Sequence, residues 1–342
     1  MPLDAAARLR TWGFNALGLA RETAMHDDGL PFLASAEFCR VGQAIVAPGL
    51  RLPDVFDPQW PGLVAVCARD TCVPLSDCRE LIGWVTDDQL EWANPSVAGR
   101  PSLLQLCLSL EPGFAAYHAA WEFALAHHGG RLDRMAQAWN ASLPNKEMLR
   151  ELTRAGEGLG TRGYLRDEAR WAREFARRYF NLTSAAVRRA DPNHLIFGCR
   201  FRRAAGATVL AECAYPAIDV SMPHWTELPA PGANPAHPVL ADNVSWMAAD
   251  FLRAVTETRT PRLTTLERIL RKARTTLHRV TRHPAVVGYA WAQWQDEPGE
   301  QPPFASGLVH VNGTDAREHT ELLEQFNLLA ENIHRARLGP AE

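Results

Sequence analysis

The 342-residue sequence lacks a strong net charge, because its 36 basic and 39 acidic residues nearly cancel to a formal charge of -3. It therefore has no electrostatic footprint of the kind that attracts a nucleic acid or an anionic membrane surface. Long hydrophobic runs are also absent near the start, where Arg8, Arg10 and Asp27 interrupt short apolar stretches. Neither a secretory signal nor a membrane span fits such a segment, so we expect a cytoplasmic protein without a nucleic-acid or membrane partner.

Paired-cysteine motifs are missing as well. The seven cysteines are an odd set without C-x-x-C spacing, which favours reduced thiols over disulfides and over a zinc site. The neighbouring His127 and His128 are candidate ligands, but adjacent residues of a helix point in different directions. A polar helix end before Gly129 explains them better. We therefore expect no metal site and no cofactor.

No internal repeat or low-complexity tract divides the chain, and hydrophobic residues make up 46% of it. A chain of this size and composition can bury a full core alone, so we expect one domain over residues 1–342. The Pro-rich stretch from Pro229 to Pro238 indicates a loop of that domain rather than a linker between domains.

Short apolar runs alternate with long amphipathic segments, in the order that a parallel β/α barrel requires. The predicted strands are Asn15–Ala20, Pro31–Glu37, Leu81–Thr86, Leu195–Phe201, Ile218–Met222, Pro238–Asn243 and Val286–Trp291. A long helical insertion, about 102–178, follows the Leu81–Thr86 strand. Ligands of β/α barrels bind at the carboxyl ends of the strands, so this elaborated loop indicates the binding end.

Two apolar stripes with helical periodicity predict buried helix faces. The first stripe contains Trp171, Phe175, Tyr179 and Leu182, and the second contains Leu322, Phe326, Leu329 and Ile333.

Several segments carry a family resemblance over most of the chain. The segment Leu9–Gly18 (LRTWGFNALG) resembles a helix-to-strand connection of the β-agarases and their relatives in clan A of the glycoside hydrolases. Further segments are similar to that group in order and spacing: Pro53–Pro58, Leu81–Trp92, Ala138–Trp139, Asp191–Phe201 and Val287–Trp294. The resemblance implies an α/β fold of the (β/α)8 TIM-barrel type.

The resemblance also implies where the chemistry would be. Retaining enzymes of this clan use an acid/base and a nucleophilic carboxyl group, about 5 to 5.5 Å apart. Gln89 stands at the acid/base position, after Asp88 at the place of a family asparagine, and Asn243 stands at the nucleophile position. An amide can neither protonate a departing alkoxide nor form an ordinary glycosyl ester. We therefore expect a pseudoenzyme whose Gln89 and Asn243 face each other across the mouth of the barrel.

The remaining residues at these strand ends could still hold a sugar. Trp291 matches the clan's tryptophan on the last strand, whose indole face stacks on a pyranose, with a buried core tryptophan as the alternative. His224 and Trp225 stand where relatives carry a tyrosine that positions the nucleophile. A carbohydrate ligand is therefore the partner we expect.

An active glycosidase with relocated carboxylates is one alternative. It would use Asp88, Asp87 or Glu91 on one side and Asp242 on the other, because an inverting mechanism tolerates a gap of about 6.5 to 9.5 Å. Strand alternation points Asp242 away from the barrel axis if its neighbour Asn243 points towards it.

Two points stay open beside this alternative. Arg200 could orient a substrate hydroxyl, or pair with Asp88 or Asp242. The chain could also be a structural or assembly module that retains only the fold, since a fold does not imply a function.

The resemblance begins at a helix that follows the first barrel strand in relatives. Met1–Ala7 is too short and too helix-like to supply that strand and its loop, so we expect seven of the eight usual strands. The open edges would then need cover. The segment Gly307–Val311, a distorted closure or a second copy could provide it. A homodimer is the favoured expectation, because the edge strand Asn15–Ala20 is too apolar to face water alone.

Overall fold

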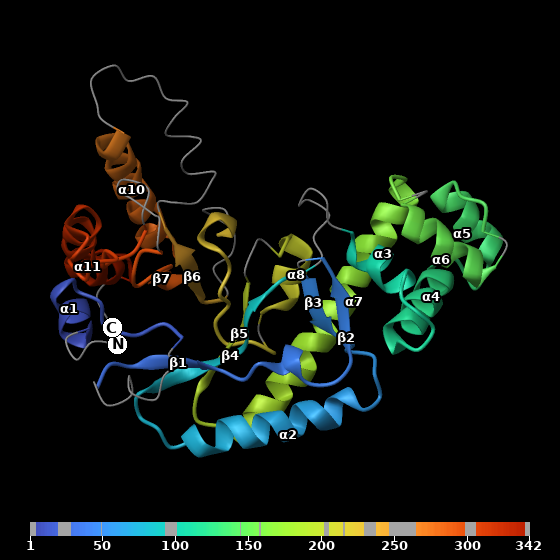
Figure 1. Ribbon diagram of the computed structural model, residues 1–342, viewed down its shortest axis with the longest axis horizontal. Helices are drawn as coiled ribbons and strands as arrows, with labels where there is room; N and C mark the ends of the chain where they lie inside the picture. The colour runs from blue at the N-terminus through green and yellow to red at the C-terminus, as the bar shows by residue number, and fades with distance from the viewer. Residues whose placement is uncertain are drawn as a thin grey trace. The chain divides into compact units, whose positions relative to one another are not determined.

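The computed structural model describes most of the chain as a mixed α/β fold (Figure 1). The described residues are 5–19, 29–48, 50–92, 101–143, 145–156, 159–201, 205–214, 216–228, 237–245, 265–297 and 306–338. They pack into two compact units. Unit 1 contains Met1–Ala34, Arg79–Ile82 and Met222–Glu342, and unit 2 contains Ser35–Cys78 and Gly83–Ser221. The single domain expected from the sequence stays a prediction.

The principal sheet has three strands in the order β1-β4-β5. These strands are β1 (Phe32–Ser35), β4 (Leu81–Leu90) and β5 (Leu195–Phe201). The boundary between the units runs through β1 and β4. β4 and β5 are parallel, and their register shifts after Trp84, Val85 and Asp87. Such irregularities re-aim side chains, and they lie here at the end of β4 where the candidate residues begin.

Unit 2 also contains a β-hairpin and the long helical insertion. The hairpin joins β2 (Ala44–Ala47) and β3 (Leu50–Pro53), with Ile45 opposite Leu52. The helices of this unit are α2 (Trp60–Cys72), α3 (Leu103–Leu108), α4 (Ala115–His127), α5 (Leu132–Trp139), α6 (Lys146–Ala155), α7 (Arg162–Ala190) and α8 (Ala207–Glu212). Two short 3-10 helices are η2 (Phe38–Arg40) and η3 (Val73–Leu75).

The insertion is helical as the sequence predicted. Side chains of Ser102, Asn145 and Thr161 accept hydrogen bonds from the first turns of α3, α6 and α7, which fixes where these helices begin. The predicted stripe on α7 is buried at Trp171, Phe175 and Tyr179. These aromatic side chains form the core between α7 and the rest of unit 2.

Unit 1 is built around a second parallel pair, β6 (Val239–Val244) and β7 (Val286–Trp291). The other elements of this unit are α1 (Ala5–Thr11), η4 (Trp225–Glu227), α10 (Thr265–Arg282) and α11 (Arg317–Leu338). α10 packs on β7 and on α11. Figure 1 shows α10 and α11 beside this pair.

The second predicted stripe, on α11, is only partly correct. Leu322 and Phe326 are buried, but Leu329 is 52% exposed. The inner face of the helix continues instead through Asn327, whose amide bonds the Tyr289 hydroxyl and donates to the Trp12 carbonyl at 2.8 Å. The buried face of α11 thus includes a polar residue and excludes Leu329.

Five of the seven predicted strands occur as strands in the described residues, and two are reduced to single bridges. Leu19 bridges Leu33 in parallel within the predicted strand Asn15–Ala20, and Ser221 is the one bridging residue within Ile218–Met222. The strands that the structure describes form three small sheets, so the closed barrel and its seven strands stay predictions.

Two expectations concern residues outside the described ranges. One is the helix-like start of the chain at residues 1–4, and the other is most of the Pro-rich loop, residues 229–236. Among the helices that the structure describes, none has the length and apolar character needed to cross a bilayer.

Candidate functional site

Three strand ends share a left-handed backbone. Glu37 (φ 60°) follows β1, Gln89 (φ 55°) is the penultimate residue of β4, and Asn243 (φ 58°) is the penultimate residue of β6. Asn140 (φ 50°) shares this geometry at the end of α5, where a left-handed residue is an ordinary helix cap. The conformation costs a non-glycine residue about 1 to 2 kcal/mol. The fold therefore holds Gln89 against its local preference, whereas Asn243 belongs to a residue type that adopts this conformation more readily.

Gln89 lies beside an ion pair in unit 2. Its side chain is exposed, whereas the preceding Asp88 side chain is only 4% exposed. Arg200 of β5 donates from Nη1 to Asp88 Oδ1 at 3.0 Å. The register of the two strands explains the pair, because Asp87 is aligned with Cys199 and the next residue on each strand is a partner. The contact occupies Asp88 with a cation at the end of β4.

Asp87 is fully buried and points towards α7. Its carboxylate accepts hydrogen bonds from the Tyr179 hydroxyl and, at 2.8 Å, from the Cys39 backbone N–H. The Tyr179 hydroxyl also lies 3.0 Å from Thr86 Oγ1. Burial raises the pKa of Asp87 to about 7, although the hydrogen bonds from Tyr179 and Cys39 oppose that shift. A side chain held in the helix-facing layer is poorly placed to reach a ligand.

Glu37 is a candidate that sequence reasoning missed. Its carboxylate accepts a hydrogen bond from Ser35 Oγ at 2.7 Å and lies 3.1 Å from Arg40 Nε. The available signal was its place as the last residue of the predicted strand Pro31–Glu37, because strand ends carry the functional groups of barrels.

Glu37, Cys39 and Asp87 together place three potential ligand atoms within 4.8 Å of one another. Burial and the nearby Asp87 carboxylate raise the pKa of the Cys39 thiol far above its usual range. The raised pKa disfavours the thiolate, and the Asp87 carboxylate of this group already accepts hydrogen bonds from Tyr179 and Cys39.

Glu91 is the remaining candidate carboxylate of the relocated mechanism near β4. It directly follows the strand and is buried, with an exposed fraction of 7%. The next residue, Trp92, packs edge-to-face on Tyr179 and Phe175. This packing carries the chain into the aromatic core of unit 2.

In unit 1, β6 and β7 bring Asn243 and Trp291 together. Val244 is aligned with Trp291, so Asn243 lies one residue before the aligned pair, at the carboxyl end of both strands. The Asn243 side chain is half-buried. Asp242 is 1% exposed, its backbone N–H donates to the Pro223 carbonyl at 3.0 Å, and it bridges His224. The segment at His224 therefore lies beside the end of β6.

The aromatic candidates of unit 1 differ in exposure. Trp291 is half-buried rather than fully enclosed, and its indole N–H donates to the Ser306 carbonyl at 2.9 Å. Trp225 is buried in η4. His224 Nδ1 lies 2.7 Å from Thr226 Oγ1, an interaction that orients the ring at the start of η4.

The structure thus gathers the predicted residues in two groups. Gln89 is grouped with Asp87, Asp88, Glu91 and Arg200 in unit 2, and Asn243 is grouped with Asp242, His224, Trp225 and Trp291 in unit 1. That Gln89 and Asn243 face each other stays a prediction.

Among known proteins, this chain is similar to agarases. No model of a known protein family matches the chain. The curated Beta-agarase A of Vibrio sp. (strain JT0107) is 24% identical over 212 residues, which are 57% of this chain and 21% of that protein.

Solved structures match more of the chain. The structure of an exo-β-agarase matches with a TM-score of 0.74 at 20% identity. The matched region is 96% of this chain and 46% of the exo-β-agarase chain. The agarase AgWH50C matches with a TM-score of 0.69 at 18% identity. The matched region is 96% of this chain and 49% of the AgWH50C chain. This chain therefore spans less than half the length of these proteins. Its mixed α/β fold is the fold of the agarase structures.

Proposed function

We propose that this chain binds an agarose-type oligosaccharide in the mouth of a TIM-type barrel without cutting it. Gln89 and Asn243 would stand at the acid/base and nucleophile positions. The observation that carries the proposal is their shared left-handed backbone at the ends of β4 and β6. Strained residues of this kind cluster at functional sites, where the surrounding structure over-determines them.

The two amides suit binding better than catalysis. A side-chain amide both donates and accepts hydrogen bonds, which matches the hydroxyl groups of a sugar. Neither Gln89 nor Asn243 can act as a general acid or form an ordinary glycosyl ester. Trp291 supplies a half-buried indole next to Asn243, and an aromatic wall with a few polar groups is typical of small-ligand sites.

Neighbouring carboxylates are poor replacements for the missing glutamates. Asp88 is nearly buried and bonded to Arg200, and Asp242 is buried within unit 1. Asp87 points into the aromatic core towards Tyr179. These placements favour binding without hydrolysis over the relocated mechanism.

Calorimetric titration with agarose-derived oligosaccharides, together with an assay for released reducing ends, tests the proposal. We expect saturable binding and no release by the wild-type chain. Release that Asp88→Asn or Asp242→Asn abolishes, but Gln89→Ala does not, would support the relocated mechanism instead. Neither binding nor release would leave the structural module as the better account.

Trp291→Ala should weaken this binding by about two- to tenfold, because a lost aromatic stacking contact costs roughly 0.5 to 1.5 kcal/mol. Trp294→Ala is the matched control in the same segment. Its ring is already engaged by Trp12, with centroids 6.0 Å apart, and by the Arg8 guanidinium. Equal losses of affinity in the two variants would argue against Trp291 as the stacking platform.

A further inference from the structure

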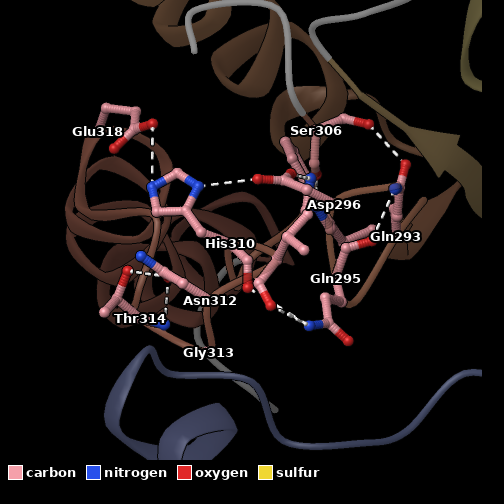
Figure 2. A network of polar contacts seen from close by, with 12 residues as sticks. Gln293, Gln295, Asp296, Ser306, His310, Asn312, Gly313, Thr314 and Glu318 are labelled. Carbon is pink, nitrogen blue, oxygen red and sulfur yellow. Dashed lines mark hydrogen bonds and ion pairs between the residues drawn. The ribbon is translucent and has the colours of Figure 1, made fainter. Parts of the chain in front are cut away.

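The chain after β7 is fastened to a second segment of unit 1 by a polar network (Figure 2). Residues 294–296 pair with residue 309: the Asp296 N–H donates to the Val309 carbonyl at 2.9 Å, and the Val309 N–H donates to the Trp294 carbonyl at 3.0 Å. Gly307 permits this close approach, because a Cβ there would lie 2.3 Å from the Asp296 nitrogen. The segment Gly307–Val311, considered from the sequence as cover for an open edge, therefore docks beside Gln295.

Asp296 joins both ends of that segment. Its side chain is only 2% exposed. One carboxylate oxygen accepts a hydrogen bond from the Gly307 N–H at 2.7 Å, and the other lies 2.8 Å from His310 Nδ1. On its other side the His310 ring faces Glu318 of α11, with 3.6 Å between Nε2 and Oε1. Figure 2 shows His310 between these two carboxylates.

The residue immediately before this segment holds Trp291. Ser306, which directly precedes Gly307, accepts the Trp291 indole N–H on its carbonyl at 2.9 Å. The Ser306 hydroxyl donates to Gln293 Oε1 at 2.8 Å. A continuous line of contacts therefore runs from His310 through Asp296, Gly307 and Ser306 to the indole.

We propose that Asp296 and His310 are positioning residues that fix the ring of Trp291 through Ser306 and thereby set the affinity for the ligand. This inference rests on the proposed function, in which Trp291 is the stacking platform. Because Ser306 takes the indole N–H, Trp291 contacts its ligand through the ring face and not through a donated hydrogen bond. The platform thus selects pyranose faces that present C–H groups.

The indole ¹H–¹⁵N resonance of Trp291, assigned with Trp291→Phe, reports its contact with Ser306 without any ligand. Asp296→Ala and His310→Ala should shift this resonance and speed exchange of the indole proton. His310→Asn should restore it, because an asparagine amide can place a donor where Nδ1 was. The control Tyr289→Phe removes a hydrogen bond to Asn327 from the same strand β7, outside the network of Asp296 and His310, and should leave the resonance unchanged.

The same variants are then titrated with the agarose-derived oligosaccharides. We expect affinity to fall at least fivefold in Asp296→Ala and His310→Ala, and to recover in His310→Asn. An unchanged resonance and affinity in folded His310→Ala and Asp296→Ala would overturn the positioning role, even where Trp291→Ala abolishes binding. A wild-type chain that binds no oligosaccharide would instead overturn the proposed function, and the resonance alone would then decide whether the network fixes the ring.

Discussion

At the scale of single residues, the backbone at the ends of β4 and β6 is more informative than the chemical identity of the side chains. Gln89 and Asn243 adopt a conformation in which glycine would be cheaper. The sequence keeps an amide at each place. Residues held in this conformation cluster at functional sites, which is the basis of the proposed binding role.

Gln89→Gly should therefore stabilise the fold and weaken the binding of oligosaccharide. Relief of the left-handed strain is expected to raise the free energy of unfolding by about 0.5 to 1 kcal/mol in urea denaturation. Asn140→Gly is the control at the cap of α5 and should give a stability change of the same sign with unchanged affinity. A lower free energy of unfolding in Gln89→Gly than in wild type would contradict the claim that the backbone of Gln89 is strained.

Asp87 gives a pH-dependent prediction. Its pKa in the folded chain is raised from 3.8 to about 7, so the folded state binds a proton more tightly than the unfolded state does. Stability from this group is therefore present at acid pH and is lost as the pH rises from about 4 to about 7. Asp87→Asn should gain stability relative to wild type between pH 5 and pH 8, by an amount on the order of 2 kcal/mol. If denaturation curves give the same difference in unfolding free energy between Asp87→Asn and wild type at pH 5 and at pH 8, this pH dependence is refuted.

At the scale of helices, two glycines near helix starts offer a matched pair. A Cβ on Gly62 of α2 would meet nothing within 4 Å, whereas a Cβ on Gly163 of α7 would lie 2.4 Å from the Ala138 carbonyl oxygen of α5. Gly62→Ala should stabilise the chain by about 0.5 to 1 kcal/mol. Gly163→Ala should destabilise it by about 1 to 3 kcal/mol, because α5 and α7 must move apart. Thermal unfolding of both variants checks the pair, and changes of equal sign would speak against the close packing of α5 on α7.

The strands show what the sequence pattern can and cannot predict. Leu195–Phe201 and Val286–Trp291 are observed with the predicted bounds, because each is a compact apolar run beside a turn. The β2-β3 hairpin was missed, since strands of four residues carry too few alternations to stand out. Leu19 and Ser221 form single bridges where strands were expected.

The candidate site was assigned from the sequence where one side chain carries the information. The resemblance in sequence singled out Gln89, Asn243 and Trp291, and their roles stay predictions. Their left-handed backbones and the exposure of the indole could not be predicted, because tertiary contacts fix both. The same holds for His310 and Asp296, which are 14 residues apart and become partners only when the segment around Val309 docks.

At the scale of the whole molecule, the described chain forms two compact units, and each contains one of the two amide positions. The solved agarases share this fold, and this chain spans less than half of their length. The homodimer expected from the open barrel edge remains a proposal.

The central claim is that Gln89 and Asn243 occupy the two catalytic positions of a glycoside hydrolase fold. Reducing-end release by Gln89→Glu/Asn243→Glu, with agarose-derived oligosaccharide as substrate, tests it most directly. We predict cleavage by the double variant and none by the wild type or by either single variant, because the two carboxyl groups serve different steps of one reaction. A double variant that folds and binds the oligosaccharide yet releases no reducing ends, or a wild-type chain that already cleaves as fast, would contradict the claim.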